Sequence, residues 1–259
     1  MPTSTSQMRR MEKYVYSAKA VAAHFKFTNG HPDFGDEFTL TYHSEAPGQV
    51  RRDTGGRSGP EISFTNSSVD ISCTKGDGVY TTIVRSALQG LNVHDVLTAD
   101  SIECGLMTVY REEWYGDPAR PKRARAIPLP AVIQNLKIHG VPFRLGQELR
   151  LPEHFIYDDA RRTKYLNGEG PEIEPVGVSA APGLRVATSR GDIEVSADTR
   201  RTQIPKFGIV DFADWMWQPP DTRTPARTAQ WVQMIRLELK NPGSGGGSGV
   251  SGNGSPFGS

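Results

Sequence analysis

The stretch that decides the fold is TIVRSALQGLNVHDVLTADSIECGLMTVY, at residues 82–110, which contains no proline. Apolar residues alternate with polar ones along most of it, at Ile83, Leu88, Leu91, Val93, Val96, Ile102, Leu106 and Val109. A period near two is typical of half-buried strands, whereas a helix repeats its apolar positions every three or four residues. The stretch therefore predicts β-strands at the centre of the fold.

Part of this stretch recurs later in the chain. LQGLNVHDV at residues 88–96 matches IQNLKIHGV at residues 133–141, mainly through its apolar positions, so the repeat predicts a shared architecture. Two copies fall short of the roughly three that a solenoid needs, although a short solenoid stays an alternative. We expect an all-β fold of mainly antiparallel strands, in a two-sheet sandwich or a barrel-like domain.

The remaining segments suggest one domain with two unstructured ends. The polar residues 1–12 predict a disordered N-terminus, residues 13–241 a single all-β domain, and the Gly/Ser-rich residues 242–259 a flexible tail. Residues 14–27 favour a strand over a helix because aromatic residues alternate there. Prolines, glycines and an arginine pair in residues 44–60 predict a mobile surface loop. One short helix is expected at about residues 156–167, where acids precede bases and a glycine follows.

Composition narrows the classes of partner. The net charge of +1 provides no global field for nucleic acid, and no segment approaches the roughly 20 apolar residues of a membrane span. The first residues lack a signal peptide, so the cytoplasm is the default location, with export by another route left open. Cys73 and Cys104 lie in strand-like runs and are interpreted as buried thiols rather than a disulfide.

No familiar catalytic motif is present. The sequence has no G-x-S-x-G, no P-loop and no G-x-G-x-x-G after a strand, so we assign no catalytic residue and no cofactor. His94 and His139 occupy equivalent positions of the repeat, with Asp95 and Asp100 near the first. These four side chains are candidate metal ligands, but turn histidines that bond the backbone are the favoured interpretation.

Exposed aromatic residues are the candidate interaction sites. Trp114 and Tyr115 precede a basic segment at Arg120, Lys122, Arg123 and Arg125, which is interpreted as a solvated loop rather than a nucleic-acid site. Trp215 and Trp217 lie in the run DWMWQPP and could face a sugar ring or a protein, or cover one end of the core. Phe257 is an apolar residue near the end of the Gly/Ser tail and a candidate anchor. As the alternative to a flexible end, the tail could dock on the same or a neighbouring subunit and add its backbone to an exposed sheet edge.

The order of motifs resembles a set of uncharacterised bacterial all-β proteins. The motifs are SALQGLNVHDVLTAD at residues 86–100, NLKIHG at 135–140, IPKFG at 204–208, WVQMIRLEL at 231–239 and GNGSPF at 252–257. The resemblance covers roughly residues 70–259. It implies an all-β protein with one helical insertion, and it brings no known activity.

These observations favour a non-enzymatic structural or interaction protein that assembles into a homo-oligomer. The expected partner is a second copy of the chain or another protein. The alternative is a module that binds a carbohydrate or another small ligand through exposed aromatic residues, and an enzyme of unrecognised class ranks third.

Overall fold

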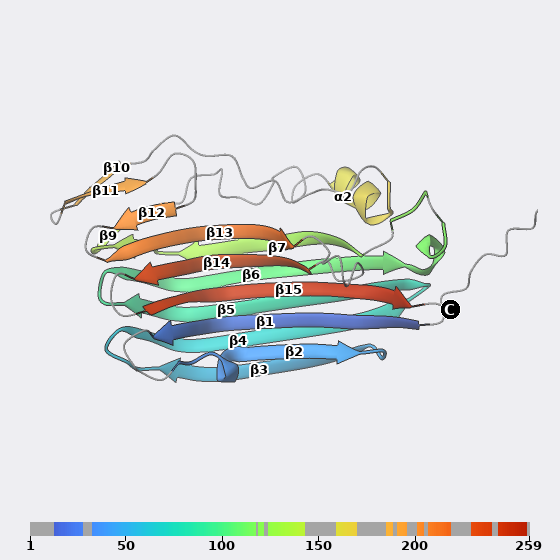
Figure 1. Cartoon of the computed structure of the whole chain (residues 1–259), viewed down its shortest axis with the longest axis horizontal. Helices are drawn as coiled ribbons and strands as arrows, with labels where there is room; N and C mark the ends of the chain where they lie inside the picture. Colours follow the sequence, from blue (N-terminus) through green and yellow to red (C-terminus); the bar gives the residue numbers. More distant parts are fainter. Residues whose placement is uncertain are drawn as a thin grey trace, which may run out of the picture.

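The chain folds into a sandwich of two antiparallel sheets in the computed structural model (Figure 1). The structure describes residues 13–27, 33–117, 119–121, 124–142, 159–169, 185–188, 191–195, 201–204, 207–218, 229–239 and 243–257. The predicted all-β class is therefore confirmed, with the sandwich as the form adopted. The predicted disorder of residues 1–12 lies outside the described residues.

Sheet A has eight strands and joins the two ends of the chain. Its order is β10-β11-β12-β13-β14-β15-β1-β2. The strands are β1 (Lys13–Phe27), β2 (Thr39–Ser44), β10 (Arg185–Thr188), β11 (Gly191–Val195), β12 (Arg201–Ile204), β13 (Gly208–Gln218), β14 (Ala229–Leu239) and β15 (Gly243–Phe257). The predicted strand at residues 14–27 is thus confirmed, as β1.

Sheet B has seven strands from the middle of the chain. Its order is β3-β4-β5-β6-β8-β9, and β7 also pairs with β6. The strands are β3 (Gly48–Arg57), β4 (Ile62–Gly76), β5 (Val79–Val93), β6 (Leu97–Arg111), β7 (Arg125–Gln134), β8 (Lys137–Ile138) and β9 (Val141–Pro142). Short 3₁₀ turns occur at Asp36–Phe38 and Glu112–Trp114.

Three details of sheet B bear on the sequence predictions. Asp77 and Gly78 both have positive φ (50° and 71°), so the Asp-Gly pair forms a tight turn between β4 and β5. Residues 48–57, expected within a mobile loop, instead form β3 at the edge of sheet B. Edge strands tolerate exposed arginines and glycines because only one side of the strand is paired. Helix α2 (Asp159–Leu166) lies within the predicted range and packs on the outer face of sheet B.

The two sheets are unusually close at their centre. Strands β1 and β15 of sheet A lie over β4, β5 and β6 of sheet B, with pairs of Cα atoms within 8 Å (Figure 1). Packed sheets are commonly about 10 Å apart. On β1 the buried positions Ala18, Ala20 and Ala22 are small, whereas the facing strands carry larger residues such as Leu88 and Leu106. Small residues in one layer therefore let the other layer approach.

Strand β15 is the largest departure from the sequence-based expectation. The Gly/Ser-rich segment predicted as a flexible tail forms an internal strand of fifteen residues, Gly243–Phe257. It pairs with β1 on one side, from Lys13↔Phe257 to Phe27↔Gly243, and with β14 on the other. Alternation of apolar residues could not reveal this strand, because it has almost no apolar side chains.

The sequence repeat corresponds to two strand segments that flank β6. Leu91 and Leu136 are both buried, and Val93 and Ile138 both pair with Leu97 at the start of β6. Each copy then enters a tight turn, with φ of 52° at both His94 and His139. The repeat thus builds two similar hairpin ends on either side of one strand.

Candidate functional site

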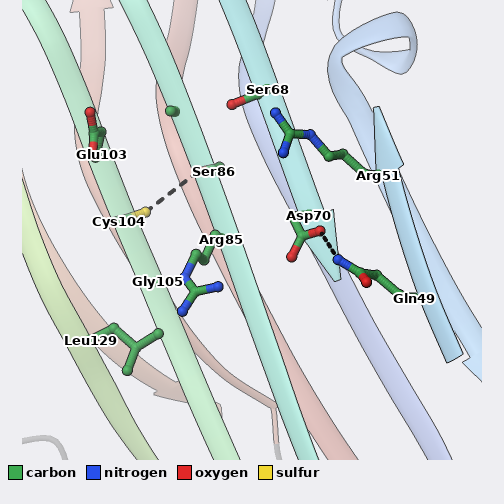
Figure 2. Close-up of a pocket in the computed structure, with 11 residues that line it drawn as sticks. Gln49, Arg51, Ser68, Asp70, Arg85, Ser86, Glu103, Cys104, Gly105 and Leu129 are labelled. Carbon is green, nitrogen blue, oxygen red and sulfur yellow. Dashed lines mark hydrogen bonds between the residues drawn. The ribbon is translucent and has the colours of Figure 1, made fainter. Parts of the chain in front are cut away.

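A shallow groove lies on the outer face of sheet B (Figure 2). Its volume is about 390 Å³. Five side-by-side positions, one from each of β3 to β7, cross it as register partners: Arg51, Asp70, Arg85, Gly105 and Leu129. A row of residues that are far apart in the sequence therefore runs across the groove, and neighbouring residues of the same strands line the rest of it.

Gly105 forms the floor of the groove. The register of β6 against β7 shifts between Glu103 and Gly105, and such irregularities re-aim neighbouring side chains. A Cβ atom at Gly105 would lie 2.9 Å from Leu129 Cδ1 and 3.0 Å from the Val84 carbonyl oxygen. Any larger residue would have to displace these atoms, so Leu129 can pack closely against β6 here because the residue is glycine.

Most charged groups of the groove are already paired. Arg51 donates to both carboxylate oxygens of Asp53, at 2.8 and 2.9 Å, and this hydrogen bonding lowers the pKa of the fully exposed Asp53. Gln49 Nε2 donates to Asp70 Oδ2 at 3.0 Å, and Ser101 Oγ donates to Glu103 Oε1 at 2.9 Å.

Arg85 differs from these groups. Among the residues that the structure describes, its side chain has no hydrogen-bond or ion-pair partner. Its side chain is exposed, and its guanidinium group lies beside Gly105 (Figure 2). The groove therefore presents one uncommitted cation amid paired polar groups.

The sequence analysis missed this site. Asp70, Arg85 and Glu103 stand on three separate strands, and nothing in their spacing indicates that they are neighbours. The signal available in the sequence was a charged residue at outward positions of strands whose other face is apolar. That signal also describes any solvated sheet face, so register was needed to find the groove.

The two repeat histidines lie at corresponding tight turns. The His94 backbone N–H donates to the Glu61 carbonyl at 3.0 Å, and its ring lies perpendicular to that of Phe207, with centroids 6.4 Å apart. The His139 backbone N–H donates to the Val96 carbonyl at 2.7 Å. These hydrogen bonds involve the backbone rather than the imidazole rings, so the interpretation of the two side chains stays a prediction.

The two candidate aspartates also have local partners. Asn92 Nδ2 donates to Asp95 Oδ1 at 2.7 Å, and Asn135 Nδ2 donates to Asp100 Oδ2 at 2.6 Å. In the described part of the chain, no three His, Cys, Asp or Glu side chains gather as a metal site would require.

The aromatic interaction candidates are placed differently from one another. Trp114 is 1% exposed and lies edge-on to Tyr110 with ring centroids 5.5 Å apart, so it is a core residue, which corrects the expectation of an exposed ring. Tyr115 is half-buried beside it. The backbones of Trp215 and Trp217 lie in β13 and that of Phe257 in β15, while their side chains lie outside the described part of the structure.

The basic segment after Trp114 is not uniformly solvated. Arg120 is exposed and lies 3.9 Å from Asp117, but Arg125 is 5% exposed and its guanidinium carbon lies 4.6 Å from the centroid of the Tyr165 ring. A cation over an aromatic face fastens β7 to helix α2. Lys122 and Arg123 lie outside the described residues.

A tyrosine cluster closes one end of the sandwich. Tyr14 stacks on Tyr80 with centroids 4.3 Å apart and on Tyr110 at 5.5 Å. Tyr16 donates its hydroxyl to the Thr74 carbonyl at 2.9 Å, and Tyr80 donates to Glu112. Burial raises the pKa of both Tyr16 and Tyr110 to about 12, because the phenolate is poorly solvated there.

The two cysteines are buried thiols, as the sequence predicts. Neither is in a disulfide. Cys73 Sγ lies 3.9 Å from Thr82 Oγ1, and Cys104 Sγ lies 3.5 Å from Ser86 Oγ. Burial raises the pKa of Cys73, which disfavours the reactive thiolate.

The chain belongs to a family that is known only as a domain of unknown function (DUF8256), whose model matches residues 14–165. The match includes every strand of sheet B but only β1 and β2 of sheet A. No curated protein and no solved structure matches the chain. Among the described residues, no helix is both long and apolar enough to span a membrane.

Proposed function

We propose that this protein is a non-enzymatic structural protein that self-associates by exchanging β15 between copies. One observation carries the proposal: the last strand of the chain lies inside sheet A, between β1 and β14, rather than at an edge (Figure 1). A terminal strand in an internal position can be supplied by a second copy without changing the sheet, as in other cases of strand exchange.

The energetics of β15 support exchange. The strand is paired along most of its length on both sides, so its departure would leave two long edges unpaired in sheet A. Unpaired edges are templates for another strand. Because β15 consists mostly of glycine and serine, backbone hydrogen bonds hold it more than side chains do, and these bonds are the same whichever copy donates the strand.

The shape of the slot supports a second copy as the donor. Cα atoms of β15 lie within 8 Å of β5 and β6 in the facing sheet, which leaves little room for side chains. A strand of ordinary composition would have to push the sheets apart. The Gly/Ser-rich segment of an identical chain fits without such a change.

The first experiment tests whether the slot accepts a strand in trans. A chain ending at residue 242 is refolded with a fluorescent peptide of residues 243–257, and binding is followed by anisotropy. We expect saturable binding with one peptide per chain. A matched peptide carrying Gly247→Pro and Gly249→Pro should not bind, because proline removes backbone donors.

A second variant covers the case in which the shortened chain does not fold. A protease site at residues 240–242 of the full chain allows β15 to be cut after folding, and the labelled peptide should then replace it. If the peptide neither binds the shortened chain nor enters the cut protein, strand exchange is rejected.

Self-association itself is tested with the full chain. Donor-labelled and acceptor-labelled copies are unfolded, mixed and refolded together, and their mass is measured by light scattering. We expect dimers or larger species with energy transfer, in a fraction that rises with concentration. A chain that is monomeric at every concentration would contradict the proposal.

A second candidate function is a small-ligand binding module, which the groove on sheet B favours. Trp114 is excluded from its binding surface by burial. The polar groups of the groove, rather than exposed aromatic rings, would hold the ligand.

A further inference from the structure

We propose that the groove on the outer face of sheet B binds a small monocarboxylate that also carries hydroxyl or ammonium groups, with the Arg85 guanidinium holding the carboxylate. This inference does not depend on exchange of β15, because the groove is formed by β3 to β7 alone.

The position of Arg85 is the first argument. It stands at the middle of the row, between its register partners Asp70 on β4 and Gly105 on β6. Leu129 packs against Gly105, where a Cβ atom would lie 2.9 Å from Leu129 Cδ1, and it forms an apolar wall of the groove near the guanidinium (Figure 2). A ligand placed there would contact both the cation and the wall.

The state of the neighbouring charges is the second argument. Arg51, Asp70 and Glu103 each have a described partner, whereas Arg85 has none among the described residues. A guanidinium group presents its N–H donors as a planar fork that matches the two oxygens of a carboxylate. Arg85 is therefore the group in the groove with binding capacity to spare.

The balance of charge selects the class of anion. The groove is lined by two cations, Arg51 and Arg85, and two anions, Asp70 and Glu103. A phosphate dianion would meet both carboxylates at short range, which opposes its binding. A single carboxylate needs only one guanidinium, so it suits this surface better.

The remaining groups define the rest of the ligand. Asp70 and Glu103 are acceptors, and Gln49 and Ser68 can both donate and accept. Such a rim favours hydroxyl or ammonium donors next to the carboxylate. A volume of about 390 Å³ is within the usual range of small-ligand sites. Acidic sugars and amino acids share this chemistry.

The test is a titration of the full-length, ¹⁵N-labelled protein, followed by NMR. The probes are D-glucuronate and L-alanine, which separate the hydroxyl source from the ammonium source, with D-glucose and inorganic phosphate as comparisons. We expect saturable shifts at Arg85, Gly105 and Ser68 with at least one carboxylate. Glucose and phosphate should bind about tenfold more weakly or not at all.

Variants distinguish a site from a surface effect. Arg85→Gln should weaken carboxylate binding about tenfold or more, and Arg85→Lys should weaken it too because lysine lacks the planar fork. Arg120→Gln, which removes an exposed arginine elsewhere, is the matched control and should change nothing. Thermal unfolding of each variant checks that the fold is intact, as the exposure of Arg85 leads us to expect.

Three results would overturn the inference. The first is no saturable shift with either carboxylate. The second is phosphate binding as tight as carboxylate binding, which would contradict the argument from charge balance. The third is equal affinity in Arg85→Gln and the unaltered protein.

Discussion

Strands β5 and β15 have the same length and both lie inside their sheets, yet they are held in opposite ways. Each has fifteen residues. Along β5, buried residues alternate with more exposed ones, and Val84, Leu88 and Leu91 enter the core. Along β15 eleven of the fifteen residues are glycine or serine. One strand is anchored by side chains, and the other by backbone pairing on both sides.

The difference explains how the two layers fit. Large residues of β5 fill the core from one side. The small residues of β1 and β15 on the other side leave room for them, so the two sheets can approach each other. A strand with few apolar side chains buries little apolar surface, so it gains little of the roughly 25 cal/mol per Å² that such burial contributes to folding. It can be stable only between two partners, and an internal position supplies both.

The largest expected loss of stability comes from a substitution in β5, the strand that is held by buried side chains. Leu88 is 1% exposed, so Leu88→Ala should lower the free energy of unfolding by about 2–5 kcal/mol. Gln89→Ala, at the exposed neighbouring position, is the control and should change it by less than about 0.5 kcal/mol. Urea denaturation measures both. Equal effects at the two positions would mean that β5 does not face the core as described.

The next effect tests whether β15 needs its glycines. Gly252 pairs with buried Ala18, and Ser251 pairs with exposed Lys19. Gly252→Val should lower the free energy of unfolding by about 1–3 kcal/mol through overpacking. Ser251→Val should be neutral or stabilising, because valine favours strands. If both substitutions stabilise the protein, the close approach of the sheets at β15 is refuted.

Glycine has a different role in β5, where it allows a left-handed backbone, and a third substitution separates this role from that of the glycines in β15. Gly90 has φ of 64°, and a Cβ there would lie 2.7 Å from Thr65 Oγ1. Gly90→Ala should therefore cost about 1–2 kcal/mol, from the left-handed backbone alone. Asn135, its counterpart in the repeat, also has positive φ (49°), and Asn135→Gly should change stability by less than about 0.5 kcal/mol. Thermal unfolding compares the stability of the two variants. If Gly90→Ala does not lower the stability, the left-handed backbone at Gly90 does not require glycine.

The burial alternation changes phase near Gly90, which supports this role. Buried residues are normally two positions apart along a strand, but in β4, β5 and β6 the spacing becomes three at neighbouring places in the sheet. The steps are from Phe64 to Ser67, from Leu88 to Leu91 and from Ala99 to Ile102. The glycines of β15 have a different role, which is to keep the strand thin.

A fourth prediction concerns pH and the tyrosine end of β1. The pKa of Tyr16 and that of Tyr110 are raised to about 12 in the folded protein, above the ordinary value near 10. Between these values the unfolded chain loses protons that the folded chain keeps, so stability is intact below pH 10 and falls as the pH rises. Each such tyrosine contributes a loss of about 1.4 kcal/mol per pH unit.

Urea denaturation at pH 8, 10 and 11 measures this slope. Tyr110→Phe should reduce this slope, because it removes one of the phenols whose pKa burial raises. A stability that does not change between pH 8 and pH 11 would show that these phenols are accessible to water.

The parts of the fold that side-chain patterns encode could be predicted from the sequence. Alternation identified the central strands, and the charge order at residues 156–167 identified α2. The parts encoded by backbone pairing could not. Neither β15 nor β3 has enough apolar alternation to distinguish it from a loop, and each exists because a neighbouring strand offers a partner.

The candidate site was even less accessible to sequence analysis. Trp114 was expected at the surface because large aromatic residues near basic ones often bind ligands, but Tyr110 and the turn after α2 cover it. Arg85 was overlooked because a lone arginine in a strand carries no motif. Its lack of a partner among the described residues, and the glycine beside it, become visible only when strand register is known.

The most direct test of the account is hydrogen exchange in the last segment of the full-length protein. If β15 is paired with both β1 and β14, its backbone amides are hydrogen-bonded on both edges. Mass spectrometry of C-terminal peptides should then show exchange at residues 243–257 as slow as in β1. Exchange at the rate of an unstructured peptide, while β5 stays protected, would contradict the internal strand and the exchange mechanism built on it.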